Sequence, residues 1–270
     1  MAKGLLLVGC GKMGGAMLDG WLNCGTPAAS VVVVEPAEAL RQPFAARGVT
    51  AVADAAAIPA GFHPDTVVLA VKPQAMGDVI GAYARFAGPG TQFLSIAAGT
   101  TIAFFEAALG ASAAIIRCMP NTPAAVGKGM LVGCPNGNVT AGQKDRADAL
   151  LGAVGEVAWI EDEALMDAVT AVSGSGPAYV FHLIECLSEA GVAAGLPADI
   201  SARLAMQTVY GAGALAKDSG TDPAQLRVNV TSPGGTTAAA LGVLMAEGGL
   251  KDLMVRAVAA ATARGKELGS

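Results

Sequence analysis

The feature that most constrains the fold of this chain is a series of short, uninterrupted apolar runs in residues 1–160. Each run is separated from the next by a segment long enough for a helix, for example residues 12–24, 37–47 and 74–86. Continuous runs are typical of strands buried on both faces of a parallel sheet, and their alternation with helices indicates a doubly wound parallel α/β fold. The expected strands are residues 4–9, 30–35, 65–71, 91–97 and 113–119, followed by 127–135 and 156–161.

The second half of the chain has a different pattern, because from residue 162 onward the strands stop and only helices are predicted. Hydrophobic residues make up 53% of the chain and aromatic residues only 4%, so much of the apolar content is alanine, which suits closely packed helices and contacts between subunits. We therefore predict an α/β domain in residues 1–160 and an all-α domain in 161–270. The expected helices are 162–171, 176–194, 198–217, 222–229, 233–246 and 249–267.

Composition excludes several classes of protein. The formal net charge is −5 and the basic residues are scattered, which argues against nucleic acid or an anionic membrane as a partner. No apolar stretch approaches the length of about 18 residues that a membrane-spanning helix needs. Five cysteines without metal-type spacing, and two histidines far apart in sequence, predict reduced thiols in a cytoplasmic protein and no metal site.

A glycine pattern follows the first expected strand and begins the next helix, the context in which G-x-G-x-x-G predicts a Rossmann-like dinucleotide site. Gly9 permits the tight turn, Gly11 lets a pyrophosphate approach the backbone, and Gly14 lets the helix pack close to the sheet. The alternative is a glycine-rich turn without a ligand. The expected cofactor contacts in this stretch are Gly9, Cys10, Gly11, Lys12, Met13 and Gly14.

A carboxylate, Glu35, ends the second expected strand, where such a group usually accepts hydrogen bonds from the adenosine ribose. It favours NAD over NADP because it would repel a 2′-phosphate, whereas Arg41 in the following helix could offset that repulsion. The sequence therefore favours NADH but does not settle the choice between NADH and NADPH. Glu35 and Pro36 are both expected cofactor contacts.

Three further strand ends carry expected cofactor contacts, because ligands of open parallel sheets bind at the carboxyl ends of the strands. Three roles are open for Lys72: a catalytic group, a phosphate contact or a solvated cap. The residue type alone does not distinguish between these roles. Small residues at the next strand end leave room for the nicotinamide ribose, and Asn121 and Thr122 lie in a loop stiffened by two prolines. The expected contacts are Ala70, Val71, Lys72 and Pro73, then Ala97, Ala98 and Gly99, and finally Asn121.

Residues 230–241, VTSPGGTTAAAL, interrupt alanine-rich helical sequence. Ser232 is a good N-cap and Pro233 a good first helical residue, so a helix is expected to begin there. Gly234 and Gly235 in a first turn would each cost about 1 kcal/mol relative to alanine. That cost favours a site where an anion, such as a substrate carboxylate, reaches the exposed N–H groups of the helix. An ordinary turn between helices is the alternative.

Residues 172–181, VSGSGPAYVF, form a second helix start of the same type, with Ser173, Ser175 and Pro177. This segment is expected to line the same pocket. It would otherwise serve only the close packing of helices.

The stretches GCGKMG, AVKPQ, SIAAG, RCMPNTPA, VSGSGPAYVF and SPGGTT together resemble the Δ1-pyrroline-5-carboxylate reductase family, in the family's order and nearly from end to end. The first is generic to dinucleotide folds, and the last two are close to diagnostic. The resemblance implies an N-terminal Rossmann domain and a C-terminal helical domain that pairs between subunits as a homodimer, often assembled into higher rings. It also implies reduction of pyrroline-5-carboxylate, a cyclic imine, by NADPH or NADH to give L-proline, the last step of proline biosynthesis.

The resemblance assigns roles within the second half of the chain. It implies that amides around Gly235 to Thr237 hold the substrate carboxylate, and that the hydroxyl of Thr237, the catalytic residue, faces the ring nitrogen. Gly220 stands where some relatives have a carboxylate residue, a departure that bears on substrate recognition. The implied substrate-binding residues are Ser175, Gly176, Ser232, Gly234, Gly235, Thr236 and Thr237.

The helical half lacks a convincing acid–base pair, which suits imine reduction. A protonated imine is a strong electrophile that keeps its proton, so orientation and a hydrogen bond favouring the iminium are sufficient. One rival interpretation, a β-hydroxyacid-type dehydrogenase, needs a lysine in the helical domain, where Lys217, Lys251 and Lys266 lie near the ends of expected helices. The other rival is a non-catalytic NAD(P)-sensing module.

Overall fold

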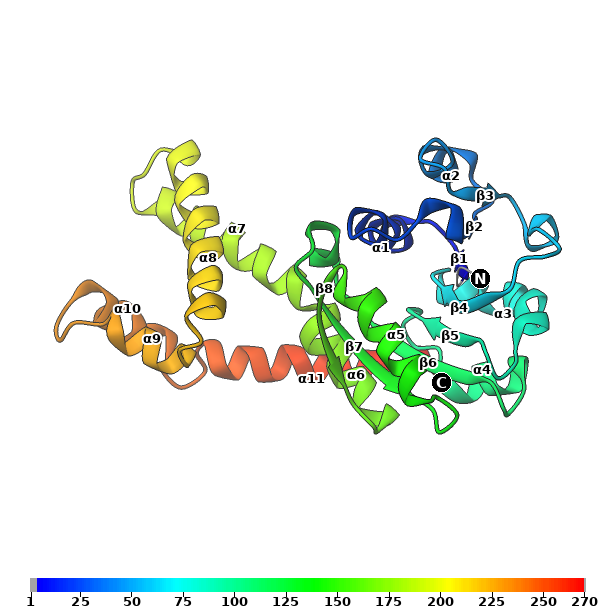
Figure 1. The fold of residues 1–270 in the computed structure, drawn as a ribbon. Helices are drawn as coiled ribbons and strands as arrows, with labels where there is room; N and C mark the ends of the chain where they lie inside the picture. Colours follow the sequence, from blue (N-terminus) through cyan, green and yellow to red (C-terminus); the bar gives the residue numbers. More distant parts are fainter. Residues whose placement is uncertain (1–3, 270) are drawn as a thin grey trace. The chain divides into compact units, whose positions relative to one another are not determined.

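A computed structural model describes residues 4–269 of the chain (Figure 1). These residues divide into two compact units. The first unit contains the described residues up to Gly174 together with those from Ala261 onward, and the second contains Ser175–Ala260. These two units are not the same as the two domains expected from the sequence, so the domain boundary after residue 160 stays a prediction.

The first unit is built on one sheet, whose strand order is β3-β2-β1-β4-β5-β6-β7-β8 in the described part of the chain. Neighbouring strands from β3 to β6 run parallel, β7 is antiparallel to β6, and β8 is parallel to β7. The bounds are β1 Gly4–Val8, β2 Val31–Val34, β3 Thr50–Val52, β4 Pro64–Leu69, β5 Gln92–Ser95, β6 Ala114–Met119, β7 Gly129–Pro135 and β8 Gly155–Trp159.

Helices cover both faces of this sheet because each central strand is apolar on both sides. Along β1, Leu5 and Leu7 join one core cluster while Leu6 and Val8 join the other. The first cluster receives side chains from helices α1 (Lys12–Asn23), α2 (Glu38–Ala45) and α5 (Ala141–Gly152). The second receives them from α3 (Pro73–Val79), the 3₁₀ helix η3 (Ile80–Phe86), α4 (Ile102–Leu109) and α6 (Met166–Val169). The predicted doubly wound α/β fold is confirmed.

An ion pair joins the sheet to the segment that follows it. The guanidinium of Arg117 on β6 is buried and donates to Glu163 Oε1 at 2.8 Å. The same oxygen accepts a hydrogen bond from the backbone N–H of Ile102, the first residue of α4, at 2.8 Å. Because one carboxylate serves both partners, it fixes β6, α4 and the start of the following segment relative to one another within the first unit.

The second unit consists of helices, with α7 (Gly176–Ala193) packed against α8 (Ala198–Ser219). Gly191 makes this packing possible, because a Cβ atom on it would collide with Ser201 Oγ. That hydroxyl donates to the carbonyl of Ser188 at 2.6 Å, so the two backbones are held close. The chain continues through α9 (Pro223–Asn229), α10 (Thr236–Leu244) and α11 (Leu250–Gly269), whose last residues belong to the first unit.

Three sequence predictions need correction. Residues 162–171 do not form one helix: a 3₁₀ turn at Glu163–Leu165, helix α6 and a π-helical turn at Thr170–Gly174 follow one another. The helix expected at 233–246 begins only at Thr236. The helix expected at 74–86 is α3 followed by η3. Within residues 4–269, no helix is long and apolar enough to span a membrane.

Candidate cofactor and substrate sites

The residues expected at the cofactor lie at one edge of the sheet. The carboxyl ends of β2, β1, β4, β5 and β6 are consecutive along that edge, because these strands are parallel neighbours in this order. Each expected stretch begins within two residues of the end of one of them: Glu35 after β2, Gly9 after β1, Ala70 after β4, Ala97 after β5 and Asn121 after β6. This is the edge at which doubly wound sheets bind dinucleotides.

The glycine turn between β1 and α1 is closed by close backbone contacts. Gly9 has φ +89° and its N–H donates to the carbonyl of Val34 at 2.8 Å. A Cβ atom on Gly9 would lie 2.8 Å from the carbonyl oxygen of Ala70, and one on Gly14 would collide with the carbonyl oxygen of Gly9. Neither position admits a side chain without a shift of the backbone.

Gly11 differs from the other two glycines, because a Cβ atom on it would have no neighbour within 4 Å. It is the N-cap of α1, and no side chain caps this helix. The first turn therefore has N–H groups that no side chain caps, next to open space at Gly11, which fits a pyrophosphate at the positive end of the helix.

A cleft of about 560 Å³ opens at this edge of the sheet. It brings together residues that follow β1, β2 and β4, which are far apart in the sequence. Of the expected cofactor contacts, those that line it are Gly9, Gly11, Glu35, Pro36, Ala70, Val71 and Lys72.

The carboxylate of Glu35 is fixed by two backbone N–H groups. Its Oε2 accepts from Cys10 at 2.8 Å and its Oε1 accepts from Ala37 at 2.9 Å. Nη1 of Arg41 donates to the carbonyl oxygens of Glu35 at 3.1 Å and Pro36 at 2.6 Å. The loop after β2 is thus tied both to the glycine turn and to helix α2.

The remaining expected residues of the first strand–helix turn do not line the cleft. The thiol of Cys10 is buried, and burial, with smaller contributions from the charges of Glu35 and Asp19, raises its pKa from 9.0 to about 12. Lys12 is exposed at the start of α1, whereas Met13 packs against the first core cluster. Pro73 is the first residue of α3. In this turn Gly9 and Gly11 line the cleft, whereas the N–H of Cys10 donates to Glu35.

The small residues after β5 have a structural partner. Gly99 has φ +74°, and a Cβ atom on it would lie 3.4 Å from the carbonyl oxygen of Leu268 near the end of α11. Ala97 is buried and its N–H lies 3.2 Å from Ser95 Oγ, while Ala98 is exposed. The lack of a side chain at Gly99 permits the close approach of the end of α11, a role that the sequence did not suggest.

Both the oxygen and the nitrogen of the Asn121 carboxamide form hydrogen bonds. Its Oδ1 accepts from the backbone N–H of Met130 on β7 at 2.8 Å. Its Nδ2 donates to the carbonyl oxygen of Ser173 at 3.2 Å and to Ser173 Oγ at 3.3 Å. The carboxamide therefore holds the π-helical turn Thr170–Gly174 against the loop after β6, which leaves the backbone of Asn121 as the group that could contact a cofactor.

The segment before α10 forms a turn where a helix start was expected, with a turn as the alternative. The N–H of Gly235 donates to the carbonyl of Ser232 at 3.1 Å, with Pro233 and Gly234 between them and Gly234 at φ +68°. Proline followed by a glycine of positive φ is the arrangement of a type II turn, so Ser232 is not the N-cap and Pro233 is not helical. Gly235 is the N-cap, and no side chain caps the helix.

The turn places the first amides of α10 at Thr236 and Thr237, where the first N–H groups have no acceptor within the helix. Thr236 is exposed and Thr237 is half-buried. Ser175 precedes Gly176 and Pro177 at the start of α7, which likewise has no side-chain cap. Both expected substrate segments are therefore helix starts with uncapped amides.

The structure adds cleft residues that the sequence analysis missed. Asp54, at the end of the short strand β3, lines the cleft together with Leu40, Ala55 and Tyr83. Burial raises the pKa of Tyr83 to about 12; Arg85 acts against this shift and Asp54 adds to it. In the sequence, Asp54 could have been found only as a carboxylate that follows a short strand. That strand, β3, has three residues and an exposed first position, so it lacks the continuous apolar run that marks the other strands.

Comparisons with known proteins agree with this architecture. The family model described as pyrroline-5-carboxylate reductase dimerisation matches residues 163–268, and one described as NADP oxidoreductase, coenzyme F420-dependent, matches residues 4–99. A pyrroline-5-carboxylate reductase of Pseudomonas aeruginosa is 42% identical over 264 residues, which cover 98% of this chain and 96% of that protein.

Two solved structures are similar over the whole chain. A pyrroline-5-carboxylate reductase of Coxiella burnetii has a TM-score of 0.94 and 34% identity, with 100% of both chains covered. A pyrroline carboxylate reductase of Plasmodium falciparum, solved with NADP bound, has a TM-score of 0.84 and 32% identity, covering 100% of this chain and 99% of that one. The resemblance drawn from the sequence motifs is confirmed, and the chain belongs to the pyrroline-5-carboxylate reductase family.

Proposed function

We propose that this chain reduces Δ1-pyrroline-5-carboxylate to L-proline with NADPH or NADH, the last step of proline biosynthesis. The observation that carries this proposal is the cleft with its uncapped helix start at the carboxyl edge of the sheet, in a chain that belongs to this family. When bound, the nicotinamide supplies the hydride that reduces the imine carbon. The residues of the chain bind and orient the two reactants.

The cofactor part of the proposal rests on the first unit. Gly11 and the amides at the start of α1 hold the pyrophosphate, because they offer free N–H groups and no obstructing side chain. Glu35 and Pro36 contact the adenosine half, while Ala70, Val71 and Lys72 follow the neighbouring strand β4 in the same cleft. Lys72 lines this cleft with an exposed side chain, and it stays a predicted phosphate contact, solvated cap or catalytic group. Ala97, Ala98, Gly99 and Asn121 stay predicted contacts.

The substrate part of the proposal rests on α10. The carboxylate of the imine accepts hydrogen bonds from the amides of Thr236 and Thr237, at the positive end of a helix that no side chain caps. Gly235, the N-cap, stays a predicted substrate contact, but its own N–H donates to the carbonyl of Ser232. Ser175 and Gly176 at the start of α7, and Ser232 and Gly234 in the turn before α10, complete the predicted substrate contacts.

Thr237 acts on the imine nitrogen. Its Oγ1 accepts a hydrogen bond from the N–H of the iminium, which favours the protonated and more electrophilic form. The proton stays on nitrogen in the product, so no separate general acid has to deliver it. A threonine therefore suffices for imine reduction. The β-hydroxyacid dehydrogenase alternative needs a lysine in the helical domain, and the lysines of the described helices α8 and α11, Lys217, Lys251 and Lys266, are exposed.

Replacement of Thr237 by alanine tests this assignment. We expect Thr237→Ala to lower kcat/KM by about 10²-fold, the scale of loss when one group that stabilises a transition state is removed, and to leave the Kd of the cofactor unchanged. Thr236→Ala is the matched control, because it removes an exposed neighbouring hydroxyl and keeps the amide. Equal kcat/KM values for the two variants would remove Thr237 from the mechanism.

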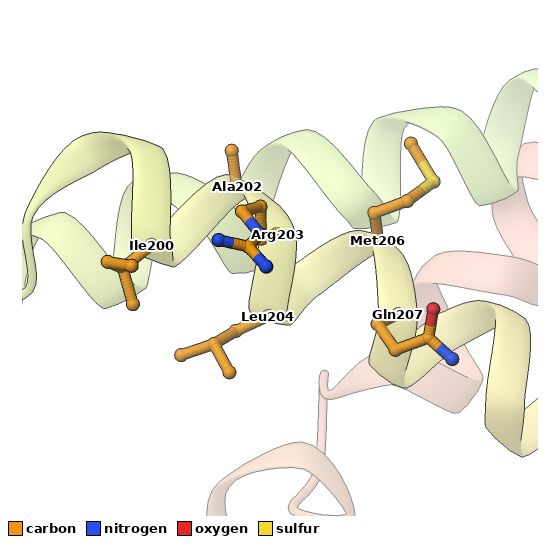
Figure 2. A pocket seen from close by; sticks show the side chains of 6 residues that line it. All are labelled: Ile200, Ala202, Arg203, Leu204, Met206 and Gln207. Carbon is orange, nitrogen blue, oxygen red and sulfur yellow. The ribbon is translucent and has the colours of Figure 1, made fainter.

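Self-association is part of the proposed function. Unit 2 exposes large apolar side chains on several helices, among them Phe181 (58% exposed), Tyr210 and Val243. One hollow on this unit has a volume of about 680 Å³ and is lined along α8 by Ile200, Ala202, Arg203, Leu204, Met206 and Gln207. Figure 2 shows the side chains of these residues. Such surface is typical of subunit contacts, and residues 163–268 match a dimerisation family.

The partner in this contact is a second copy of the chain, as a homodimer that can assemble into a higher ring. A cytoplasmic location, and the absence of nucleic acid or a membrane among its partners, stay predictions. A non-catalytic NAD(P)-sensing module stays the alternative that turnover decides.

A further inference from the structure

We propose that this chain selects NADH over NADPH, because two fixed carboxylates, those of Glu35 and Asp54, lie at the end of the cleft where the adenosine ribose binds. The inference rests on the cofactor site of the proposed function and adds the identity of the cofactor. The ribose is placed at this end because it meets the acidic residue that ends the second strand of a dinucleotide-binding fold.

The carboxylate of Glu35 is already oriented in the protein. Oε2 accepts from Cys10 N at 2.8 Å and Oε1 accepts from Ala37 N at 2.9 Å, so both oxygens are held between the glycine turn and the start of α2. An ionised carboxylate has about four acceptor sites. Each oxygen therefore keeps a lone pair for a ribose hydroxyl, and neither can donate to a phosphate.

Asp54 brings a second carboxylate to the same end of the cleft. It follows β3, the neighbour of β2, and the N–H of Glu35 donates to Val52 of that strand at 3.0 Å. Its Oδ1 accepts from Ala56 at 2.9 Å and Ala57 at 3.1 Å, as the cap of the 3₁₀ helix Ala55–Ala57. This cap holds the side chain in place, so a 2′-phosphate would meet two carboxylates that cannot both turn away.

The nearby cations do not offset this charge in the cleft. Arg41 donates through Nη1 to the carbonyl oxygens of Glu35 and Pro36, and Arg85 donates through Nη2 to the carbonyl of Ala55 at 2.7 Å. Neither arginine is among the described residues that line the cleft. The cation that does line it, Lys72, follows β4, which lies on the far side of β1 from β2.

Equilibrium binding tests the proposal without the reaction. NADH and NADPH are titrated into the full-length protein without imine, and the fluorescence of the bound nicotinamide gives each Kd. We expect NADH to bind more tightly by about tenfold or more, because juxtaposed like charges that are partly desolvated repel strongly. Competition by 5′-AMP and by adenosine 2′,5′-bisphosphate should show the same order for the adenosine half alone.

Charge-neutralising variants identify the source of the preference. Glu35→Gln should reduce the ratio of the two Kd values, chiefly by tightening NADPH. Asp54→Asn should act in the same direction, and it keeps the cap because asparagine is also a good N-cap. Glu38→Gln is the matched control, since Glu38 is exposed on α2 and does not line the cleft; its ratio should equal that of the wild type.

Two results would overturn the inference. NADPH binding as tightly as NADH, with a selective loss of NADPH affinity in Arg41→Ala, would assign the 2′-phosphate to Arg41 and leave the proposed reaction intact. Failure of both nucleotides to bind would overturn the cofactor site itself. Turnover is not measured in these titrations, so a protein that binds NADH selectively but reduces no imine would contradict the proposed function and not this inference.

Discussion

At the scale of single residues, the three glycines of the first strand–helix turn have separable roles. Gly9 and Gly14 lack space for a side chain because the backbone at Ala70 and at Gly9 itself lies against them. Gly11 has space, and its φ of −68° is available to any residue. Two of the glycines thus serve the fold, and the third keeps the cleft open for a ligand.

The variant Gly11→Val tests whether Gly11 serves ligand binding and not the fold. We expect the free energy of unfolding to fall by no more than about 1 kcal/mol, the cost of a poor N-cap residue, while the affinity for either dinucleotide is lost because the side chain fills the pyrophosphate position. Gly15→Ala is the control on the same helix, since its Cβ would be in ordinary contact 3.6 Å from the carbonyl oxygen of Cys10. Titration and chemical denaturation measure the two effects; retained tight binding by Gly11→Val would show that the pyrophosphate lies elsewhere.

The sequence predicts the position of a single residue well where the fold class alone determines it. It predicts the role of a residue poorly where that role depends on a contact with a distant segment of the chain. Gly9 and Glu35 lie at strand ends in the predicted positions because the fold class places them there. The carboxamide of Asn121 instead binds Ser173, 52 residues away, and Gly99 accommodates the end of α11. No local pattern could reveal these two partners, because they depend on tertiary packing.

At the scale of elements, Asn121 joins three of them: the loop after β6, strand β7 and the π-helical turn that precedes α7. We expect Asn121→Ala to lower the free energy of unfolding by about 1–3 kcal/mol, because the N–H of Met130 would be left without its acceptor. Ser173→Ala is the control, since it removes only the hydroxyl 3.3 Å from Nδ2 and should cost about 1 kcal/mol or less. Equal losses in urea denaturation of the two variants would contradict this role.

The sequence predicts a helix or strand more reliably when the element is long and its apolar residues form a regular or continuous pattern. The strands of the central sheet are continuous apolar runs and were located, whereas β3 has three residues and was missed. The direction of β7 was also not predicted, since a run of residues does not show which way a strand is paired. Before α10, Ser-Pro-Gly-Gly fits both a capped helix start and a type II turn, and the positive φ of Gly234 selects the turn.

At the scale of the whole molecule, buried thiols make stability depend on pH. Burial raises the pKa of Cys118 from 9.0 to about 12, and Cys10 is raised to the same range. Above pH 9 the unfolded chain loses thiol protons that the folded chain retains, so it binds fewer protons and unfolding becomes easier. We expect the free energy of unfolding to be insensitive to these groups below pH 9 and to fall as the pH rises from 9 toward 12.

Denaturant titrations at a series of pH values measure this slope. Cys118→Ala should make it shallower because one buried thiol is removed, whereas Cys24→Ala, at an exposed position, should leave it unchanged. A slope that is the same in both variants would mean that the buried thiol does not contribute.

The reductase activity is tested by initial rates of NADH and NADPH oxidation with Δ1-pyrroline-5-carboxylate, with proline quantified as the product. We predict turnover with stoichiometric proline and a higher kcat/KM for NADH. Protein that binds a dinucleotide tightly but forms no proline with either cofactor would contradict the proposed function and favour a sensing role.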